Sequence, residues 1–421
     1  MRAWSSHANS ELDPELLRLP GFRAYLAAAA LGRLAFSAVA VLQGIAVYQL
    51  ARDPLALGWM GLAMAVPAIG LVLFGGHVAD RYNRRWIVIA ARTAMALLTL
   101  GMAAIETLAV ADGLALLYTI SFFIGVVGAF ANPASAGLEA QVVPPEYALR
   151  GASLLASTGQ VAGLIGAPLG GLVYDIVGPG IAFPILSGIF TLSAACLVLG
   201  VPARPASVVA GPRPRMLVNI AEGIRAVFAD QRLVGSMALD LFAIFFGGVI
   251  GLLPLFATDI LHVGSAGAGA LRAAASAGSV VAMAIAWRYP PRRHAGLALH
   301  LAIAGFGVGI IVFGLSTSFL LSLAAIFFTG ACDGVSVVVR QAIVRLLAPD
   351  HMRGRIAAVR MVFDNSSNEL GDFESGVAAA LIGAGPAVCM GGAITIASAA
   401  ITAWRAPKLL RLDIGRIVAP L

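Results

Sequence analysis

Charged residues, cysteines and metal-binding patterns are scarce in this chain, and each scarcity excludes a class of protein. Only 12% of the 421 residues are charged, whereas 60% are hydrophobic and the mean hydropathy is +0.91. A soluble protein would carry roughly 25% charged residues, so the composition indicates a polytopic membrane protein. The three cysteines fall in different apolar segments and form neither a disulfide framework nor a metal-ligand pattern. No H-E-x-x-H pattern and no Gly-x4-Gly-Lys-Ser/Thr loop occurs, so neither a metalloprotease site nor direct use of ATP is predicted.

Lysine is almost absent as well, since Lys408 is the only lysine among 28 basic residues. The net charge of +7 would suit a nucleic-acid partner. Apart from Arg33, Arg52 and Arg272, however, we assign the basic residues to cytoplasmic segments, as membrane topology requires. We therefore expect no nucleic-acid binding. Residues 1–19 lack the apolar core of a signal peptide, so the N-terminus is expected to stay in the cytoplasm, with the first span acting as the insertion signal.

Apolar runs long enough to cross a bilayer make up most of the chain. They cover residues 24–50, 55–77, 86–110, 114–139, 152–174, 180–202, 233–257, 267–287, 297–315, 319–344, 356–381 and 386–404. The sequence thus predicts an all-α membrane protein with twelve transmembrane helices in two six-helix bundles, residues 1–203 and 233–421. A basic, proline-containing cytoplasmic linker, 204–232, separates them, and its part Met216–Phe228 is a candidate surface helix.

An internal repeat relates the two halves of the chain. Pro145-Glu146 with Arg150-Gly151 after the fourth span recurs as Pro349-Asp350 with Arg353-Gly354 after the tenth. The two copies lie about half the chain apart, as expected for parallel structural repeats. Transporters built from such repeats bind substrate between the halves, near the middle of the membrane.

The segment 364–376, DNSSNELGDFESG, puts acidic and polar residues inside the predicted eleventh span. Asn368, Glu369 and Asp372 fall at helical spacing and share one face, and Asp364 lies on that face too. An ionisable side chain at mid-bilayer costs at least ~2.5–3.5 kcal/mol, so such residues face water or a partner. The segment therefore predicts a helix that lines an aqueous cavity.

Intramembrane polar residues are the candidates for substrate binding and proton coupling. We favour Glu369 for a transport role, because a buried carboxylate tuned toward neutrality can take up a proton on one side and release it on the other. For Asp372 and Glu374, a structural pair with Arg33 or Arg272 is an equal alternative. The full candidate set is Glu369, Asp372, Asn368, Glu374, Asp364, Arg33, Asp333, Gln43, Asp240 and Arg272.

Three of these candidates have a second interpretation. Asp240 lies near a helix end and suits a structural role slightly better. Gln43 could bind substrate, but a single glutamine more often bridges two helices. Arg33 is expected to face the cavity, where it would balance the acids or bind an anionic or catecholate-like substrate.

The loop after the second span carries a recognisable pattern. It reads Gly76-His-Val-Ala-Asp80-Arg81-Tyr-Asn83-Arg84-Arg85. This resembles the signature loop of the major facilitator superfamily, Gly-x-x-x-Asp-Arg-x-Gly-Arg-Arg, with Asn83 at the second glycine. Asn83 can supply the positive φ that a tight turn needs, and Asp80 can pair with nearby arginines. The resemblance implies a latch that joins the two halves in one transport state. The latch residues would be Gly76, Asp80, Arg81, Arg84, Arg85, Arg340 and Arg353.

The fifth span is rich in glycine at a spacing of four residues. Gly163, Gly166, Pro168, Gly170 and Gly171 are similar to the exporter motif of proton antiporter families, Gly-Pro-x-x-Gly-Gly, with the proline one place later. The alternative is a generic small-residue surface for close helix packing.

The segment 333–376, together with 45–48, 53–58 and Pro67, looks like the enterobactin-exporter-like and macrolide-efflux-like branch of the drug:proton antiporters. This resemblance covers nearly the whole chain, although residues 130–135 lack the basic residue that some antiporters carry in the fourth span. It implies proton-coupled efflux of a small amphiphile, such as a siderophore or drug, without cofactor or bound metal. It also implies a bacterial inner-membrane protein, in which twelve spans would leave both termini in the cytoplasm. The expected partners are the substrate, protons and the lipid bilayer, with the protein as a monomer.

Two other functions are weighed against antiport. The same fold could import a solute or let it diffuse. An intramembrane metal-dependent enzyme is a remote alternative, because no His/Cys/carboxylate ligand set is present; we expect no enzymatic activity.

Overall fold

A computed structural model describes residues 14–108, 112–202, 222, 224–225, 227–289, 291, 293–347 and 352–415. Within these ranges the protein is helical throughout, without strands, which confirms the all-α prediction. The first half contains α1 (Pro14–Arg18), α2 (Pro20–Ala51), α3 (Pro54–Arg81), α4 (Arg84–Leu108), α5 (Gly113–Val142), α6 (Ala148–Val177) and α7 (Pro179–Gly200). The second half contains α9 (Gln231–Phe246), α10 (Leu253–Leu255), α11 (Gly264–Arg288), α12 (Ala295–Leu315), α13 (Phe319–Leu347), α14 (Arg353–Ile382), α15 (Ala384–Arg405) and α16 (Pro407–Leu410).

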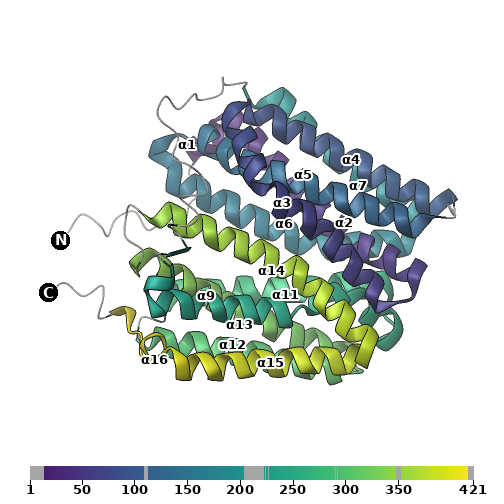
Figure 1. Ribbon diagram of the computed structural model, residues 1–421. Coiled ribbons are helices and arrows are strands. Elements are labelled where there is room, and N and C mark those ends of the chain that lie inside the picture. The colour runs from purple at the N-terminus through teal and green to yellow at the C-terminus, as the bar shows by residue number, and fades with distance from the viewer. Residues whose placement is uncertain are drawn as a thin grey trace.

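Eleven helical segments in the described ranges are long and apolar enough to span a membrane. The twelfth span is α14, whose 30 residues are as many as in α5 or α6 but carry the polar stretch noted in the sequence. It packs against α3 of the first half and against α9 and α15 of the second. In Figure 1, α14 crosses the view between the two halves.

The seventh span is not the continuous helix over 233–257 that we predict from hydropathy. Helix α9 ends at Phe246, and a 3-10 turn (Val249–Leu252), the short α10 and a π turn (Phe256–Ile260) complete the crossing. Gly247 and Gly248 explain the break, because glycine is a poor helix former, and Pro254 in α10 has no N–H to donate.

Short turns at the helix ends are set by local chemistry. Asp53 caps α3 by accepting a hydrogen bond from the N–H of Leu55 at 2.9 Å, and Pro54 follows as the first helical residue. Gly178 has φ +73° and connects α6 to α7 in one residue. Such a conformation strains any residue with a Cβ.

The two halves are arranged side by side (Figure 1). They contact each other through α3 with α14, through α6 with α11, and through α2 with α10 and α11. Helices α1 and α16 lie at one end of the bundle, here called the terminal end. The opposite end, called the far end, carries the turns at Arg52–Asp53, Gly178 and Gly383.

Apolar cores differ between the two ends. Near the far end, one cluster of buried residues combines both halves, for example Leu42 and Tyr48 with Leu252 and Phe256. Toward the terminal end, the described buried residues form two clusters, one drawn from the first half alone and one from the second. Among the residues that the structure describes, the halves therefore share a core near the far end and have separate cores at the terminal end.

The predicted division into two bundles and a linker stays a prediction. Residues 203–221, which hold most of the linker and the start of the candidate surface helix, lie outside the described residues. Residues 222, 224, 225, 227 and 228 of that candidate helix are helical.

Candidate functional site

The break in the seventh span is occupied by a carboxylate from α14. Asp372 accepts a hydrogen bond from the backbone N–H of Gly251 at 3.1 Å. A Cβ on Gly251 would lie 2.6 Å from the Asp372 carboxylate oxygen, so a larger residue here would displace the carboxylate from this position. Arg272 of α11 interacts electrostatically with the same carboxylate. Arg272 is thus near enough to act on the Asp372 charge, and three elements of the second half meet at this side chain; whether the pair is structural or takes part in transport stays a prediction.

This arrangement lies against the first half. Phe373 of α14 packs its ring on Trp59 of α3, with centroids 5.3 Å apart. A Cβ on Gly58 would be 3.1 Å from the Phe373 carbonyl oxygen, so the two backbones nearly touch. Irregular backbone inside a membrane is tolerated where it is buried in protein or lines a water-filled cavity. Asp372 thus sits next to the boundary along which two halves of a transporter would move.

The other acidic candidates of α14 are only partly described. Glu374 is half-buried and accepts a hydrogen bond from the Ser375 hydroxyl at 3.5 Å, while Asn368 is exposed. Asp364 and Glu369 belong to α14, but their side chains lie outside the described residues. Their transport roles stay predictions.

A second charged cluster lies inside the second half. Arg340 of α13 forms a buried ion pair with Asp240 of α9, and its other terminal nitrogen is 3.7 Å from Asp333. Asp333 is 41% exposed, whereas Arg340 and Asp240 are almost fully buried. Arg340, which we predict as part of the latch, is thus engaged within its own half. The pair between Asp240 and Arg340 joins α9 to α13, in line with the structural interpretation of Asp240.

Removing one member of this buried pair is expected to destabilise the protein. Loss of one partner leaves an uncompensated charge and costs about 3–5 kcal/mol, so Asp240→Asn and Arg340→Met should each lower the unfolding midpoint strongly. The matched control Asp333→Asn removes a more exposed carboxylate and should cost about 1 kcal/mol or less. Thermal unfolding in detergent measures all three. Equal midpoints for Asp240→Asn and Asp333→Asn would contradict this assignment.

Polar candidates of the first half have separate surroundings. Gln43 is buried and donates to the Ser121 hydroxyl at 2.6 Å, so it bridges α2 and α5, as the second interpretation has it. Arg33 is exposed on α2 next to Gly163 of α6. The described contacts do not join Arg33 to the Asp372 site.

Sequence reasoning missed Arg92, which we count among the cytoplasmic arginines. It lies inside α4, its Nε is buried without a hydrogen bond, and it interacts electrostatically with Tyr25. The sequence could have revealed this, because Arg92 falls within the predicted span 86–110. His300, in the second turn of α12, is buried, with Nδ1 2.7 Å from the Gly296 carbonyl oxygen.

The turn between α3 and α4 is built differently from our expectation. Asn83 has no positive φ; in the described chain the non-glycine residues with positive φ are Arg52, His262 and His294. Instead, the Asn83 side chain accepts from the N–H of Arg85 at 3.1 Å and caps α4. A side-chain cap therefore replaces the glycine turn.

The signature-loop side chains contact the first half. Asp80 pairs with Arg84 at 3.3 Å, which confirms the expected ion pair. Arg85 donates to the Leu197 and Val198 carbonyls at 3.1 and 2.6 Å, where α7 ends. Arg81 and Gly76 belong to the end of α3. The side chain of Arg353 lies outside the described residues, so the latch stays a prediction.

Glycines of α6 permit close helix packing. A Cβ on Gly166 or Gly170 would lie 2.3 Å from the Leu34 carbonyl oxygen or 2.7 Å from the Ala38 Cβ, both on α2. Gly171 faces the other half, where its Cβ would lie 2.2 Å from the Ser265 carbonyl oxygen, and Pro168 lies against Gly269 of α11. The small-residue surfaces thus serve packing both within and between the halves.

Polar contacts fasten the halves at the far end. Asp175 of α6 accepts from the N–H groups of Ser265 and Ala266 at 3.3 and 2.7 Å, at the start of α11. Asp259 accepts from the Tyr48 hydroxyl and forms an ion pair with Arg52 at 3.2 Å. These contacts reinforce the shared apolar core at that end.

Comparisons with known proteins agree with this architecture. The model of the Major Facilitator Superfamily matches residues 25–371. The Enterobactin exporters EntS of Shigella boydii serotype 18 and Escherichia coli O1:K1 are each 24% identical over 289 residues, which cover 68% of either chain.

Solved structures show the same architecture. The match to a POT family transporter in complex with 5-aminolevulinic acid covers 92% of this chain and 96% of that transporter, with TM-score 0.72 and 12% identity. A bacterial homologue of the human lysosomal transporter Spinster, inward-facing and unoccupied, covers 97% and 98%, with TM-score 0.66 and 15% identity. Because these two structures are only 12% and 15% identical in sequence, their similarity shows a shared fold and does not extend to substrate or mechanism.

Proposed function

The chain belongs to the Major Facilitator Superfamily, and from that premise we propose that it exports a small amphiphilic molecule, such as a siderophore or drug, in exchange for protons. It is a multi-pass membrane transporter of small molecules and not an enzyme. The proposal concerns the direction of transport, the coupling ion and the substrate class.

The observation that carries the proposal is that the buried cores of the described residues differ between the two ends of the bundle. The two halves share a core and polar contacts near the far end, whereas each half has its own core at the terminal end. Alternating access needs a state of this kind, in which a site between the halves communicates with one side of the membrane.

The distribution of charge supports an assignment of the two ends. Arg52 is at the far end, while most other described basic residues lie at the terminal end. The latter include Arg18, Arg23, Arg81, Arg84, Arg85, Arg150, Arg232, Arg288, Arg293, Arg345, Arg405, Lys408 and Arg411. Basic residues favour the cytoplasmic side, so the terminal end would face the cytoplasm and both termini would be cytoplasmic. The described state would then open inward, ready to receive a cytoplasmic substrate.

Proton coupling is supported by the carboxylates of α14. Asp372 lies at the helix break next to Arg272, and Glu369 precedes it by about one helical turn. Intramembrane acids of this kind mark proton and substrate pathways in transporters. The siderophore class rests on the similarity to the enterobactin exporters, and an anionic substrate would also suit Arg33 or Arg272.

Transport assays with purified protein in liposomes test the proposal. A screen of siderophores, antibiotics and metal chelates by ligand-induced thermal stabilisation at two pH values first supplies a substrate. With the outer face toward an acidic lumen, that substrate should accumulate in the lumen, because protons leave as it enters. Equal accumulation without a pH gradient would instead indicate facilitated diffusion. Gradient-driven movement in the opposite direction would indicate import.

A further inference from the structure

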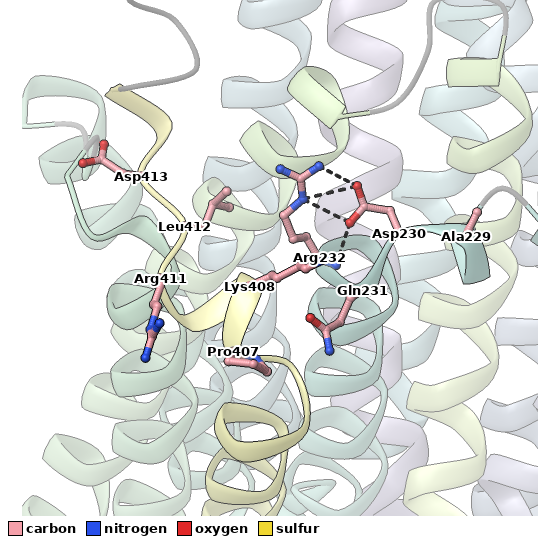
Figure 2. A pocket seen from close by; sticks show the side chains of 9 residues that line it. All are labelled: Ala229, Asp230, Gln231, Arg232, Pro407, Lys408, Arg411, Leu412 and Asp413. Atoms are coloured by element: carbon pink, nitrogen blue, oxygen red, sulfur yellow. Dashed lines mark hydrogen bonds and ion pairs between the residues drawn. The ribbon is translucent and has the colours of Figure 1, made fainter.

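A pocket at the terminal end of the second half lies outside the proposed transport pathway. It has a volume of about 680 Å³ and is lined by residues 229–232, at the start of α9, and by residues 407, 408 and 411–413, in and after α16 (Figure 2). Three cationic side chains and two carboxylates contribute to the lining, so its net charge is positive. The chain's only lysine, Lys408, is among them.

The lining segments are held in place by described contacts. The α16 segment is anchored by Leu409 and Leu412, both buried in the core of the second half. The Gly296 N–H donates to the Leu412 carbonyl at 3.2 Å, and the Gln231 side chain donates to the Arg405 carbonyl at 2.7 Å. The two walls of the pocket are therefore fixed to α12 and α15.

One carboxylate of the pocket already has its counter-ion. Asp230 receives side-chain hydrogen bonds from Arg232, the shortest at 2.7 Å, and caps α9 through the Arg232 N–H at 2.8 Å. Figure 2 shows the two side chains facing each other. Hydrogen bonds from the Arg232 side chain hold the pKa of Asp230 below its usual range, so the pair stays ionised. Lys408 and Arg411, both exposed, are the remaining cations of the lining, and Asp413 is its second carboxylate; Lys408 also acts electrostatically on Asp230.

Exposed aromatic residues place this pocket at the level of the membrane surface. Trp404, at the end of α15, is 75% exposed, and Phe228, directly before the first lining residue, is 70% exposed. The Arg405 guanidinium lies over the Trp404 ring, 5.1 Å from its centroid. An exposed tryptophan at the end of a transmembrane helix, such as Trp404, is typical of the headgroup layer, and the exposed Phe228 adds an apolar surface beside it. Basic pockets at this depth attract anionic headgroups, each basic residue contributing about fivefold in affinity.

We propose that the pocket between the start of α9 and α16 binds the phosphate-bearing headgroup of an anionic phospholipid, with Lys408 and Arg411 as the cations that hold it. A bound headgroup connects the start of α9 with the α16 segment at the terminal end of the second half. Free phosphate shares the headgroup's charge and hydrogen-bond chemistry. The depth of the pocket and its flanking aromatic residues favour the lipid.

The test compares unfolding midpoints of the full-length protein in detergent micelles containing increasing phosphatidylglycerol. The wild type should show a saturable upward shift, and Lys408→Gln/Arg411→Gln should need about 30-fold more lipid for half of that shift. Phosphatidylcholine should have no such effect. A control variant, Arg288→Gln/Arg345→Gln, removes the same charge from the same half outside the pocket and should behave like the wild type. Lys408→Arg should retain the affinity.

Each contrary outcome overturns the proposal. If both double variants lose the lipid-dependent shift of the unfolding midpoint equally, the lipid responds to the overall surface charge and not to this pocket. If the pocket variant keeps the wild-type curve, the lipid binds elsewhere. If inorganic phosphate gives the same saturable shift as the lipid, the site binds a free anion. Should the pocket variant fold poorly, the single variants Lys408→Gln and Arg411→Gln are each expected to need about fivefold more lipid, and an unchanged curve for both would reject the assignment.

Discussion

Replacing Gly171 by leucine should force the outer ends of the two halves apart and shift the protein about 10- to 100-fold toward a state open at the far end. A Cβ at this position would lie 2.2 Å from the Ser265 carbonyl oxygen of the other half. Because the obstacle is backbone, a rotamer change cannot relieve it, and overpacking of this kind costs about 1–3 kcal/mol. The measurement is the rate at which a cysteine at Ala167, 1% exposed in this state, reacts with a membrane-impermeant maleimide in a background lacking the native cysteines.

The same helix provides the control for this substitution. Gly159 also lies on α6, but a Cβ there meets no atom within 4 Å, so Gly159→Leu should leave the reaction rate of Ala167→Cys unchanged. Transport should fall with Gly171→Leu and persist with Gly159→Leu. Equal maleimide reactivity in the two leucine variants would show that the far-end contact between α6 and α11 does not control access.

Asp372→Asn should abolish proton-driven transport and also destabilise the protein. The asparagine oxygen can still accept from the Gly251 N–H, but the charge that balances Arg272 is lost. Arg272 and Asp372 are both partly buried, so the unpaired charge should cost less than the ~3–5 kcal/mol of a fully buried pair. Adding Arg272→Gln should therefore restore much of the unfolding midpoint without restoring coupling. Midpoints in detergent and pH-gradient-driven uptake into liposomes separate the two effects.

Two further carboxylates serve as comparisons in the same assay. Glu369→Gln should fold normally and lose coupling, as the sequence predicts, whereas Glu374→Gln should keep both properties. Full proton-driven transport in Asp372→Asn would remove Asp372 from the coupling pathway. Full activity in Glu369→Gln would do the same for Glu369. If the double variant is no more stable than Asp372→Asn, the electrostatic pairing with Arg272 contributes little to folding.

Hydropathy was sufficient to locate the membrane spans, because length and apolarity are properties of each segment alone. Predicted spans such as 24–50 and 319–344 correspond to α2 and α13 with ends displaced by a few residues. The polar eleventh span was also placed correctly, since its length and its place between apolar spans outweigh its composition. The break after Phe246 was missed, because Gly247-Gly248 alone does not distinguish a packed helix from an interrupted one.

Pairing between distant residues could not be predicted in the same way. Arg340 and Asp240 lie a hundred positions apart, and only the packing of α9 on α13 brings them together. For Asp372 the sequence left two arginines as alternative partners, Arg33 and Arg272, and in the structure it is Arg272 that acts on its charge. The glycines of α6 were more informative, because small residues spaced by four indicate close packing before the partner is known.

The latch depends on conformation, which a sequence does not specify. In this state Asp80 and Arg85 contact residues of the first half, and the two halves have separate cores at that end. A loop that joins the halves in the opposite state would be expected to show such local partners here. Its function therefore remains a prediction about a second conformation.

Alternating access by rocking of the two halves is the central claim, and paired distance measurements test it most directly. One pair of spin labels would replace Ile176 and Leu320 at the far end, and a second pair Tyr82 and Leu346 at the terminal end; all four side chains are exposed. When substrate is added or the pH is changed, a population of molecules should appear in which the far-end distance is longer and the terminal-end distance is shorter. Distances that stay fixed under every condition, or that rise and fall together, would contradict the account.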